Sequence, residues 1–237
     1  MTTRKAIPLA LISFCALSTH ALGATVYTPN GTAVTVVADP EGLSVPEIAA
    51  WNNHVALTYP NAINIGSATS RRNCHSYAWH SQSSTNYYWM NGTSMFGNQE
   101  DKYWTDGSYV RTTPSRTPHI YGRISYAGDH SGYIADTAQN TPKFVRSKWG
   151  VGPTMAHAPN YAAQVYPQDY GNPTAYYTRA NVCPFGTGNY CGDPLRVNQN
   201  ANYLYSCAGA GVFSLKSTCN NKGCKLNGNG LNDVCKP

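Results

Sequence analysis

The stretch Asn73-Cys74-His75-Ser76-Tyr77-Ala78-Trp79 and the later stretch Gly128-Asp129-His130-Ser131-Gly132-Tyr133-Ile134 decide the expected fold. Asn73 belongs to the residue types that cap helix N-termini, so the first stretch predicts a helix with Cys74 in its first turn. The second stretch follows a turn-like Ala-Gly-Asp sequence and predicts a β-strand with His130 at its start.

Further elements are expected on both sides of these stretches. Ser44, Pro46 and Glu47 form a helix start with a capping box, and Pro60 ends that helix. Strands are expected at residues 120–126, 129–134 and 143–149, separated by turn-like sequences. Helices followed by an antiparallel run of strands indicate an α+β fold.

The composition excludes several classes of protein. Charged residues make up 12% of the chain against roughly 25% in average usage, while Tyr (18), Gly (21) and Pro (15) are abundant. Helical bundles and disordered tails are both rich in Glu and Lys, so we expect a loop-rich and partly β protein. The net charge is +6 without a dense Lys/Arg cluster, which argues against a nucleic-acid partner.

Residues 1–24 are typical of a secretory signal peptide. Arg4 and Lys5 precede an apolar run over residues 6–17, and small residues follow at a plausible cleavage point. The run is shorter than the roughly 18 residues that a membrane-spanning helix needs, and no later segment reaches that length. We therefore expect a secreted monomer, extracellular or periplasmic, without a membrane anchor.

The cysteines divide into two groups. Cys15 would leave with the signal peptide, and Cys74 stands far from all others. The remaining six predict three disulfides of open pairing, as in small stapled modules: Cys183, Cys191, Cys207, Cys219, Cys224 and Cys235. Cys74 is then left over, which indicates either an intermolecular link or a free, reactive thiol.

Cys74 has the context of a nucleophile. Unpaired N–H groups in the first turn of a helix favour the thiolate and lower the thiol pKa. His130 is the candidate base, and the third, orienting group should lie on the next strand, where Ser147 and Lys148 are the polar residues and Ser147 is the candidate we choose. The alternative is that Cys74 is a small core residue. No metal site or cofactor is expected, because His75 and His80 do not share a helix face.

The order of these residues resembles that of the NlpC/P60 and CHAP group of papain-like cysteine peptidases and amidases. Residues 73–79 and the stretch Ser147-Lys148-Trp149-Gly150 carry the resemblance, which covers about residues 45–160. It implies a helix packed on a small antiparallel sheet, Cys74 as nucleophile, His130 as base and the Cys74 N–H in an oxyanion hole. It also implies peptidoglycan or a related peptide as the substrate. Asn73, Trp79 and His157 are the expected substrate-binding residues.

Four segments are expected along the chain: a signal peptide (1–24), a catalytic domain (25–165), a linker or strap (166–182) and a disulfide-stapled module (183–237). The last segment looks like the Cys-rich modules found at the ends of exported bacterial hydrolases, where a role in wall or glycan attachment is expected. Three alternatives stay open. The tail serves only stability, the protein is a non-catalytic wall- or glycan-binding or toxin-like protein that keeps the fold, or the Cys–His pair catalyses acyl transfer.

Overall fold

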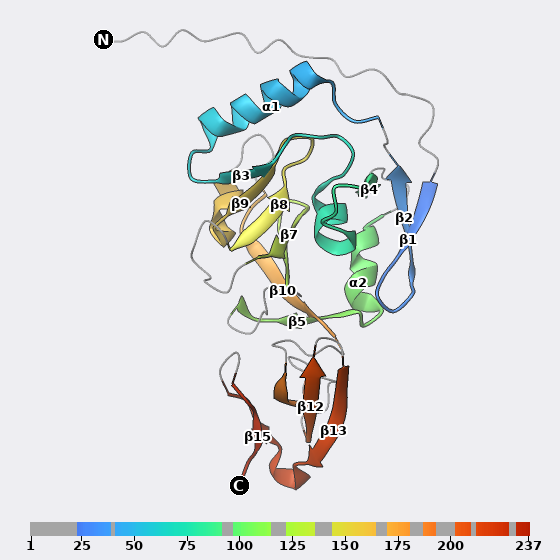
Figure 1. Cartoon of the computed structure of the whole chain (residues 1–237), viewed down its shortest axis with the longest axis vertical. Coiled ribbons are helices and arrows are strands. Elements are labelled where there is room, and N and C mark those ends of the chain that lie inside the picture. Colours follow the sequence, from blue (N-terminus) through green and yellow to red (C-terminus); the bar gives the residue numbers. More distant parts are fainter. Residues whose placement is uncertain are drawn as a thin grey trace, which may run out of the picture.

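The computed structural model describes residues 23–38, 41–91, 97–114, 122–135, 144–164, 170–180, 187–192, 202–209, 212–227 and 231–237. Within these residues the chain forms four antiparallel sheets, and one of them contains seven strands (Figure 1). The described chain is mostly β. The expected α+β fold, a papain-like helix packed on a small antiparallel sheet, is therefore wrong.

The seven-stranded sheet is the centre of the molecule and has the strand order β3-β9-β8-β7-β6-β10-β5. Its strands are β3 (Ile63–Gly66), β5 (Tyr109–Thr112), β6 (Arg123–Tyr126), β7 (His130–Ile134), β8 (Val145–Lys148), β9 (Thr154–His157) and β10 (Pro173–Arg179). Three of them, β6, β7 and β8, are the predicted run of antiparallel strands, which is confirmed.

The sheet is larger than expected because distant segments join it. Strand β10 lies in the segment expected as a linker or strap, and it pairs with β6 on one side and with β5 on the other. Tyr176 of β10 faces Ile124 across one pairing and Thr112 across the other. The sequence does not predict this pairing, because neither β5 nor β10 shows a clear alternation of apolar and polar residues.

Helix α1 (Val45–Thr58) begins as predicted, with Ser44 as its N-cap and Glu47 completing the capping box. The Glu47 carboxylate accepts a hydrogen bond from the Ser44 backbone N–H at 2.9 Å. Only Val55 of the helix is buried, and together with Tyr59 it packs against the seven-stranded sheet. The apolar core on this face contains Ile124, Ile134, Phe144, Val145, Trp149, Met155 and Tyr170.

A second core joins the central sheet to the π-helical turn Ser76–His80, the short helix α2 (Lys102–Thr105) and a small sheet. The small sheet has the order β1-β2-β4, from β1 (Gly23–Tyr27), β2 (Ala33–Ala38) and β4 (Tyr88–Met90). Trp79 is 2% exposed and lies against three tyrosine rings, those of Tyr103, Tyr109 and Tyr177. The packing of Trp79 therefore fixes the helical turn that begins at Cys74 against the second core.

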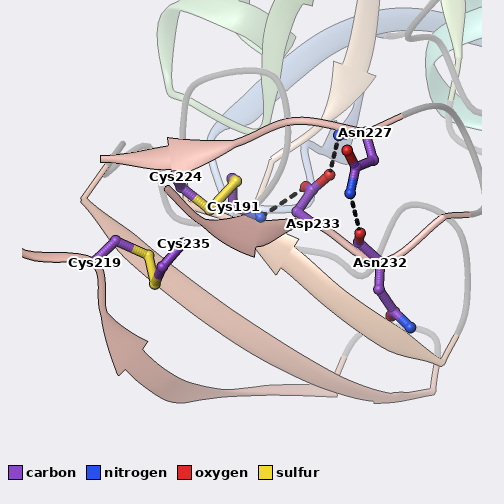
Figure 2. The surroundings of a disulfide bond; sticks show 7 residues. All are labelled: Cys191, Cys219, Cys224, Asn227, Asn232, Asp233 and Cys235. Carbon is purple, nitrogen blue, oxygen red and sulfur yellow. Dashed lines mark hydrogen bonds between the residues drawn. A yellow bond between two sulfur atoms is a disulfide. The ribbon is translucent and has the colours of Figure 1, made fainter. Parts of the chain in front are cut away.

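The C-terminal part lies at the far end of the molecule from α1 (Figure 1). It contains one three-stranded and one two-stranded sheet, formed by β11 (Gly188–Cys191), β12 (Tyr203–Gly209), β13 (Val212–Thr218), β14 (Cys224–Lys225) and β15 (Val234–Cys235). Disulfides join Cys191 to Cys224 and Cys219 to Cys235 (Figure 2). Cys207 is also disulfide-bonded, while Cys183 lies outside the described residues.

A buried carboxylate supplements these disulfides. Asp233 is 0% exposed and accepts hydrogen bonds from the backbone N–H groups of Cys191 at 2.9 Å and Asn227 at 2.7 Å (Figure 2). The sequence gives no signal for this carboxylate. The disulfides indicate that the protein resides in an oxidising compartment.

Residues 1–22 of the expected signal peptide lie outside the described residues, and β1 already begins at Gly23. Among the described helices, none has the length and apolar character required to span a bilayer.

Candidate active site

Cys74 lies at the start of the helical turn, where the sequence places it. The Asn73 side-chain oxygen accepts hydrogen bonds from the backbone N–H groups of Ser76 at 3.0 Å and Met90 at 3.2 Å. The predicted cap is therefore confirmed, and it also fastens the turn to β4. Cys74 is the one free cysteine among the described residues and is 7% exposed.

A pocket of about 330 Å³ opens over this thiol. Residues from five separated parts of the chain line it: Asn73, Cys74, His75, Trp89, Asn91, Gly128, Asp129, Gly150 and Tyr170. Cys74 is therefore buried by its neighbours and yet faces a space that a substrate could occupy.

The charges around the thiol favour its ionised form. Burial by itself would raise the pKa of Cys74, but the positive charges of His75 and His130 outweigh burial and hold the pKa well below its usual range. Burial would likewise lower the pKa of His75, but the Cys74 thiolate, Asp129 and Glu100 raise it well above its usual range. Both shifts favour a thiolate at Cys74 and an imidazolium at His75.

His75 is held from two sides. Its Nε2 lies 3.1 Å from Oδ1 of Asp129, and its Nδ1 lies 3.0 Å from the Ser131 hydroxyl oxygen. The Ser131 oxygen also accepts a hydrogen bond from the Trp79 indole at 2.9 Å. A carboxylate and an oriented hydroxyl therefore fix the ring and stabilise its charge.

Asp129 reaches His75 from the turn between β6 and β7. Its backbone φ is +55°, a left-handed conformation that Asp adopts more readily than most residues. A second carboxylate, Glu100, lies 3.8 Å from His75 Nδ1 and is 6% exposed. Burial raises the pKa of Glu100, although His75 and a hydrogen bond from Asn91 oppose that shift.

His130 begins β7 as predicted and is 1% exposed. Its ring stacks on the ring of Tyr170, with 3.8 Å between centroids and 10° between planes. Neither ring nitrogen has a hydrogen-bond partner of standard geometry in the described part of the chain. The charge of this ring nevertheless acts on the Cys74 thiol, so the structure brings together Cys74 and His130, the predicted nucleophile and base.

Ser147, the predicted orienting residue, has other partners. Its oxygen accepts a hydrogen bond from the Trp149 indole at 2.9 Å and lies 2.7 Å from His157 Nε2. The other nitrogen of His157 lies 2.8 Å from the Ala158 carbonyl oxygen, so this nitrogen carries the proton and Nε2 accepts from Ser147. Ser147 therefore pairs with Trp149 and His157 rather than with His130.

The three predicted substrate-binding residues lie in different places. Asn73 lines the pocket, although its side chain is engaged in capping. Trp79 lies in the second core. His157 is 0% exposed, and its pKa is lowered to about 3, mainly by burial and also by the charge of His130. His157 is therefore a neutral core residue that is hydrogen-bonded to Ser147.

Lys148, which follows Ser147 on β8, is buried beside the site, and the sequence gives no indication of that burial. It is 0% exposed, and its ammonium group donates hydrogen bonds to the carbonyl oxygens of Gly150, at 2.6 Å, and Gly152. Burial and the charge of Arg72 lower its pKa to about 7, while the Cys74 thiolate opposes the shift. Because Gly150 lines the pocket over Cys74, Lys148 fixes one wall of that pocket.

Three residues of this site could in principle ligate a metal ion, since atoms of His75, Glu100 and Asp129 lie within 4.8 Å of one another. The geometry fits an ion-paired imidazolium better. Glu100 approaches Nδ1 of the ring and Asp129 approaches Nε2. One imidazole cannot direct a single lone pair to an ion that is shared with carboxylates on opposite edges of its ring.

The sequence therefore points to Cys74 and His130, which the structure brings together, but it does not predict the charged residues around them. His75 and Asp129 each adjoin a predicted catalytic residue, directly after Cys74 and directly before His130. This adjacency is the only signal that could have found them. Glu100 and Tyr170 lie far away in the sequence and reach the site through the fold alone.

Comparison of the chain with models of known protein families, with curated proteins and with solved structures finds no match. The function must therefore be inferred from the chemistry of the site itself.

Proposed function

We propose that the protein is an exported cysteine hydrolase that cleaves amide bonds through a Cys74 thiolate. One observation carries this proposal: a free thiol faces a pocket and has two imidazoles that lower its pKa. A thiol that served only to fill the core would need neither the pocket nor the positive charges. Burial alone would have raised its pKa.

The two histidines have different tasks in this proposal. Both nitrogens of His75 are engaged, by Asp129 and by Ser131, so His75 stays protonated and supplies a fixed positive charge to the thiolate. His130, whose ring acts on the Cys74 thiol, serves in this proposal as the general acid and base. The stacked ring of Tyr170 holds its orientation.

The reaction then follows the usual course of thiol catalysis. The thiolate attacks the carbonyl carbon of a substrate amide, and the N–H of Cys74 is positioned to stabilise the negative oxygen, since the first N–H groups of a helix have no intrahelical acceptor. His130 protonates the leaving amine, and a thioester remains on Cys74. His130 next removes a proton from water, which attacks the thioester and releases the carboxylic acid and the thiolate.

The substrate class follows from the compartment and from the sequence. A protein with disulfides acts outside the cytoplasm, and the resemblance of the Cys74 stretch to wall-active enzymes favours peptides of the bacterial cell wall. In this proposal the stapled C-terminal part holds the catalytic part close to that substrate.

The test compares purified protein, Cys74→Ala and Cys74→Ser on peptidoglycan sacculi and on a mixed peptide library, with release of new amino groups as the readout. We expect release by the wild type only, because a serine hydroxyl is a much weaker acid than a thiol and stays protonated at neutral pH, and the alanine variant lacks a nucleophile. Thermal unfolding of both variants controls for folding. Equal release by Cys74→Ala would contradict the proposal, and binding to sacculi without release would favour the non-catalytic alternative.

A further inference from the structure

The turn between β6 and β7, residues 127–129, carries the carboxylate that faces His75. Tyr126 pairs with His130 across the two strands, so three residues close this hairpin. Hairpin loops of three residues commonly end in a residue of left-handed conformation, for which glycine is preferred. Here that residue is Asp129, with a φ of +55°. The presence of Asp where glycine is favoured points to a role for its side chain.

Burial does not hold this carboxylate in place. The side chain of Asp129 is 71% exposed, whereas that of His75 is 4% exposed. An ion pair with an exposed partner stabilises little unless its geometry is fixed, because a mobile side chain loses rotamer entropy when it pairs. The position of the Asp129 carboxylate therefore depends on where the backbone of the 127–129 turn lies.

A short segment from a distant part of the chain fastens that turn. Residues 170–172 run beside it, directly before β10. The Gly128 N–H donates a hydrogen bond to the Tyr170 carbonyl oxygen at 2.9 Å. The Ala127 N–H donates a hydrogen bond to the Asn172 carbonyl oxygen at 3.2 Å. Because the turn itself is exposed, these bonds rather than core packing fix its place.

Gly171 allows the 170–172 segment to approach the turn this closely. Its φ is +67°, a left-handed conformation that glycine adopts without strain. A Cβ at this position would lie 3.0 Å from the Cβ of Ala127, so that the neighbouring turn would have to give by a few tenths of an ångström. Both the backbone conformation and the close contact therefore require glycine at position 171.

The same segment also reaches the catalytic imidazole of the proposed function. The ring of Tyr170 stacks on that of His130, with 3.8 Å between centroids. Tyr170 lines the pocket over Cys74 together with Gly128 and Asp129. The 170–172 segment is thus part of the site and not only a connection that leads into β10.

We propose that Gly171 is a positioning residue of the Cys74 site. It admits the 170–172 segment against the 127–129 turn, so that the turn holds the Asp129 carboxylate at His75, which in turn stabilises the Cys74 thiolate. The inference rests on the proposed function, because it concerns the activation of the same nucleophile. It adds a residue that acts on the nucleophile through Asp129.

Other charged groups face Cys74 and His75 from β7, from the 3-10 turn Gln99–Asp101 and from β8. They are His130, Glu100 and Lys148. The three atoms closest to a Cβ at position 171 all belong to Ala127 and Gly128. A substitution of Gly171 therefore displaces the turn rather than these three groups.

The test is the pH dependence of Cys74 alkylation by iodoacetamide in the native protein, with peptide mass mapping of the product. In Gly171→Ala we expect the pH midpoint of labelling to move upward, because a displaced Asp129 favours the protonated form of His75 less. The shift should not exceed that of Asp129→Asn. A residue with a merely structural role would lower the temperature of unfolding and leave the midpoint in place.

Two further variants isolate the contact. Gly31→Ala is the matched control, because Gly31 also has a left-handed φ, of +88°, and a Cβ there meets no heavy atom within 4 Å. Its midpoint should equal that of the wild type. Adding Ala127→Gly to Gly171→Ala removes the crowded methyl group and should return the midpoint towards the wild-type value.

A double-mutant comparison tests the route of action. If Gly171 acts through Asp129, Gly171→Ala should cause no further shift in an Asp129→Asn background. If Gly171→Ala does not fold, Gly171→Asn takes its place, because Asn adopts the left-handed conformation more readily and still places a Cβ against Ala127.

The outcomes separate this inference from the proposed function. An unchanged midpoint in a folded Gly171 variant, or an equal shift with and without the Asp129 carboxylate, would overturn the positioning role while the nucleophile stands. A wild-type Cys74 that is inert, or that reacts only above the ~8.5 of an ordinary thiol, would overturn the proposed function and the positioning role with it.

Discussion

Nε2 of His75 lies 3.1 Å from Oδ1 of Asp129, so the residue that follows Cys74 is held by the residue that precedes His130. The pair connects the helical turn of Cys74 to the turn between β6 and β7. Both residues line the pocket over the thiol and also a second hollow, whose lining includes Glu100 and Asp101. The charge of the site thus depends on a contact between segments that are more than fifty residues apart.

Replacing Asp129 by Asn should raise the pKa of the Cys74 thiol. Asp129 favours the protonated form of His75, and protonated His75 favours the thiolate. Without the carboxylate, each effect weakens, so the pH at which half of Cys74 is reactive should move upward. The check is a pH series of iodoacetamide labelling, with Glu41→Gln as the control. An unchanged midpoint would show that Asp129 does not support the ion pair.

Replacing His130 by Gln should separate reactivity from turnover. General acid–base groups contribute about 10²- to 10⁴-fold to rate, and we expect a loss of that size in amide cleavage. Labelling of Cys74 at neutral pH should persist, because His75 still provides positive charge to the thiolate. Tyr170→Phe keeps the stacked ring and serves as the control, with cleavage close to that of the wild type. Normal cleavage by the His130→Gln variant would show that His130 is not the base and would leave His75 as the candidate.

The pKa of Lys148 predicts a pH dependence of stability. Its pKa is about 7 in the folded protein against an ordinary value of 10.5, so between these values the unfolded chain binds more protons than the folded one. Stability contributed by this group therefore rises with pH across that window, by about 1.4 kcal/mol per unit. Urea unfolding of the wild type and of Lys148→Met between pH 7 and 10 tests this difference in slope. Parallel slopes for the two proteins would show that Lys148 is charged when folded.

Removing the Cys191–Cys224 disulfide should destabilise the C-terminal part alone. The bond joins residues 33 apart in the sequence. For a loop of this length, loop-closure entropy predicts that removing the bond lowers the free energy of unfolding by about 4 kcal/mol. The double variant Cys191→Ser, Cys224→Ser should therefore be cleaved by trypsin after lysines of the tail, such as Lys216. The labelling of Cys74 should not change. A loss of Cys74 reactivity would mean that the tail supports the active site.

The sequence predicts the elements with strong local signals and misses those that depend on long-range pairing. The capping box of Ser44 and Glu47, the Asn73 cap and the strands β6, β7 and β8 follow from residue type and spacing. The fold class is wrong because strands such as β10 carry no alternation and pair with segments far along the chain. Aromatic packing positions such strands, as where Tyr177 of β10 packs against Trp79. The high tyrosine content of the sequence indicates that such packing exists but not which residues take part.

The same limit applies to the site. Cys74 and His130 are identified because a helix start and a strand start are local features. Ser147 is expected to orient His130 because it lies on the neighbouring strand, but strand adjacency does not specify hydrogen-bond partners. Its hydroxyl is engaged instead by Trp149 and His157 within the core.

The most direct test of the central claim is alkylation of the native, non-reduced protein across a pH series, with peptide mass mapping of the modified cysteines. Lowering of the Cys74 pKa by two imidazoles predicts that Cys74 is modified well below the ~8.5 of an ordinary thiol, while Cys191, Cys207, Cys219, Cys224 and Cys235 stay unmodified in their disulfides. An inert Cys74, or one that reacts only above that pH, would contradict the activated nucleophile on which the proposed function depends.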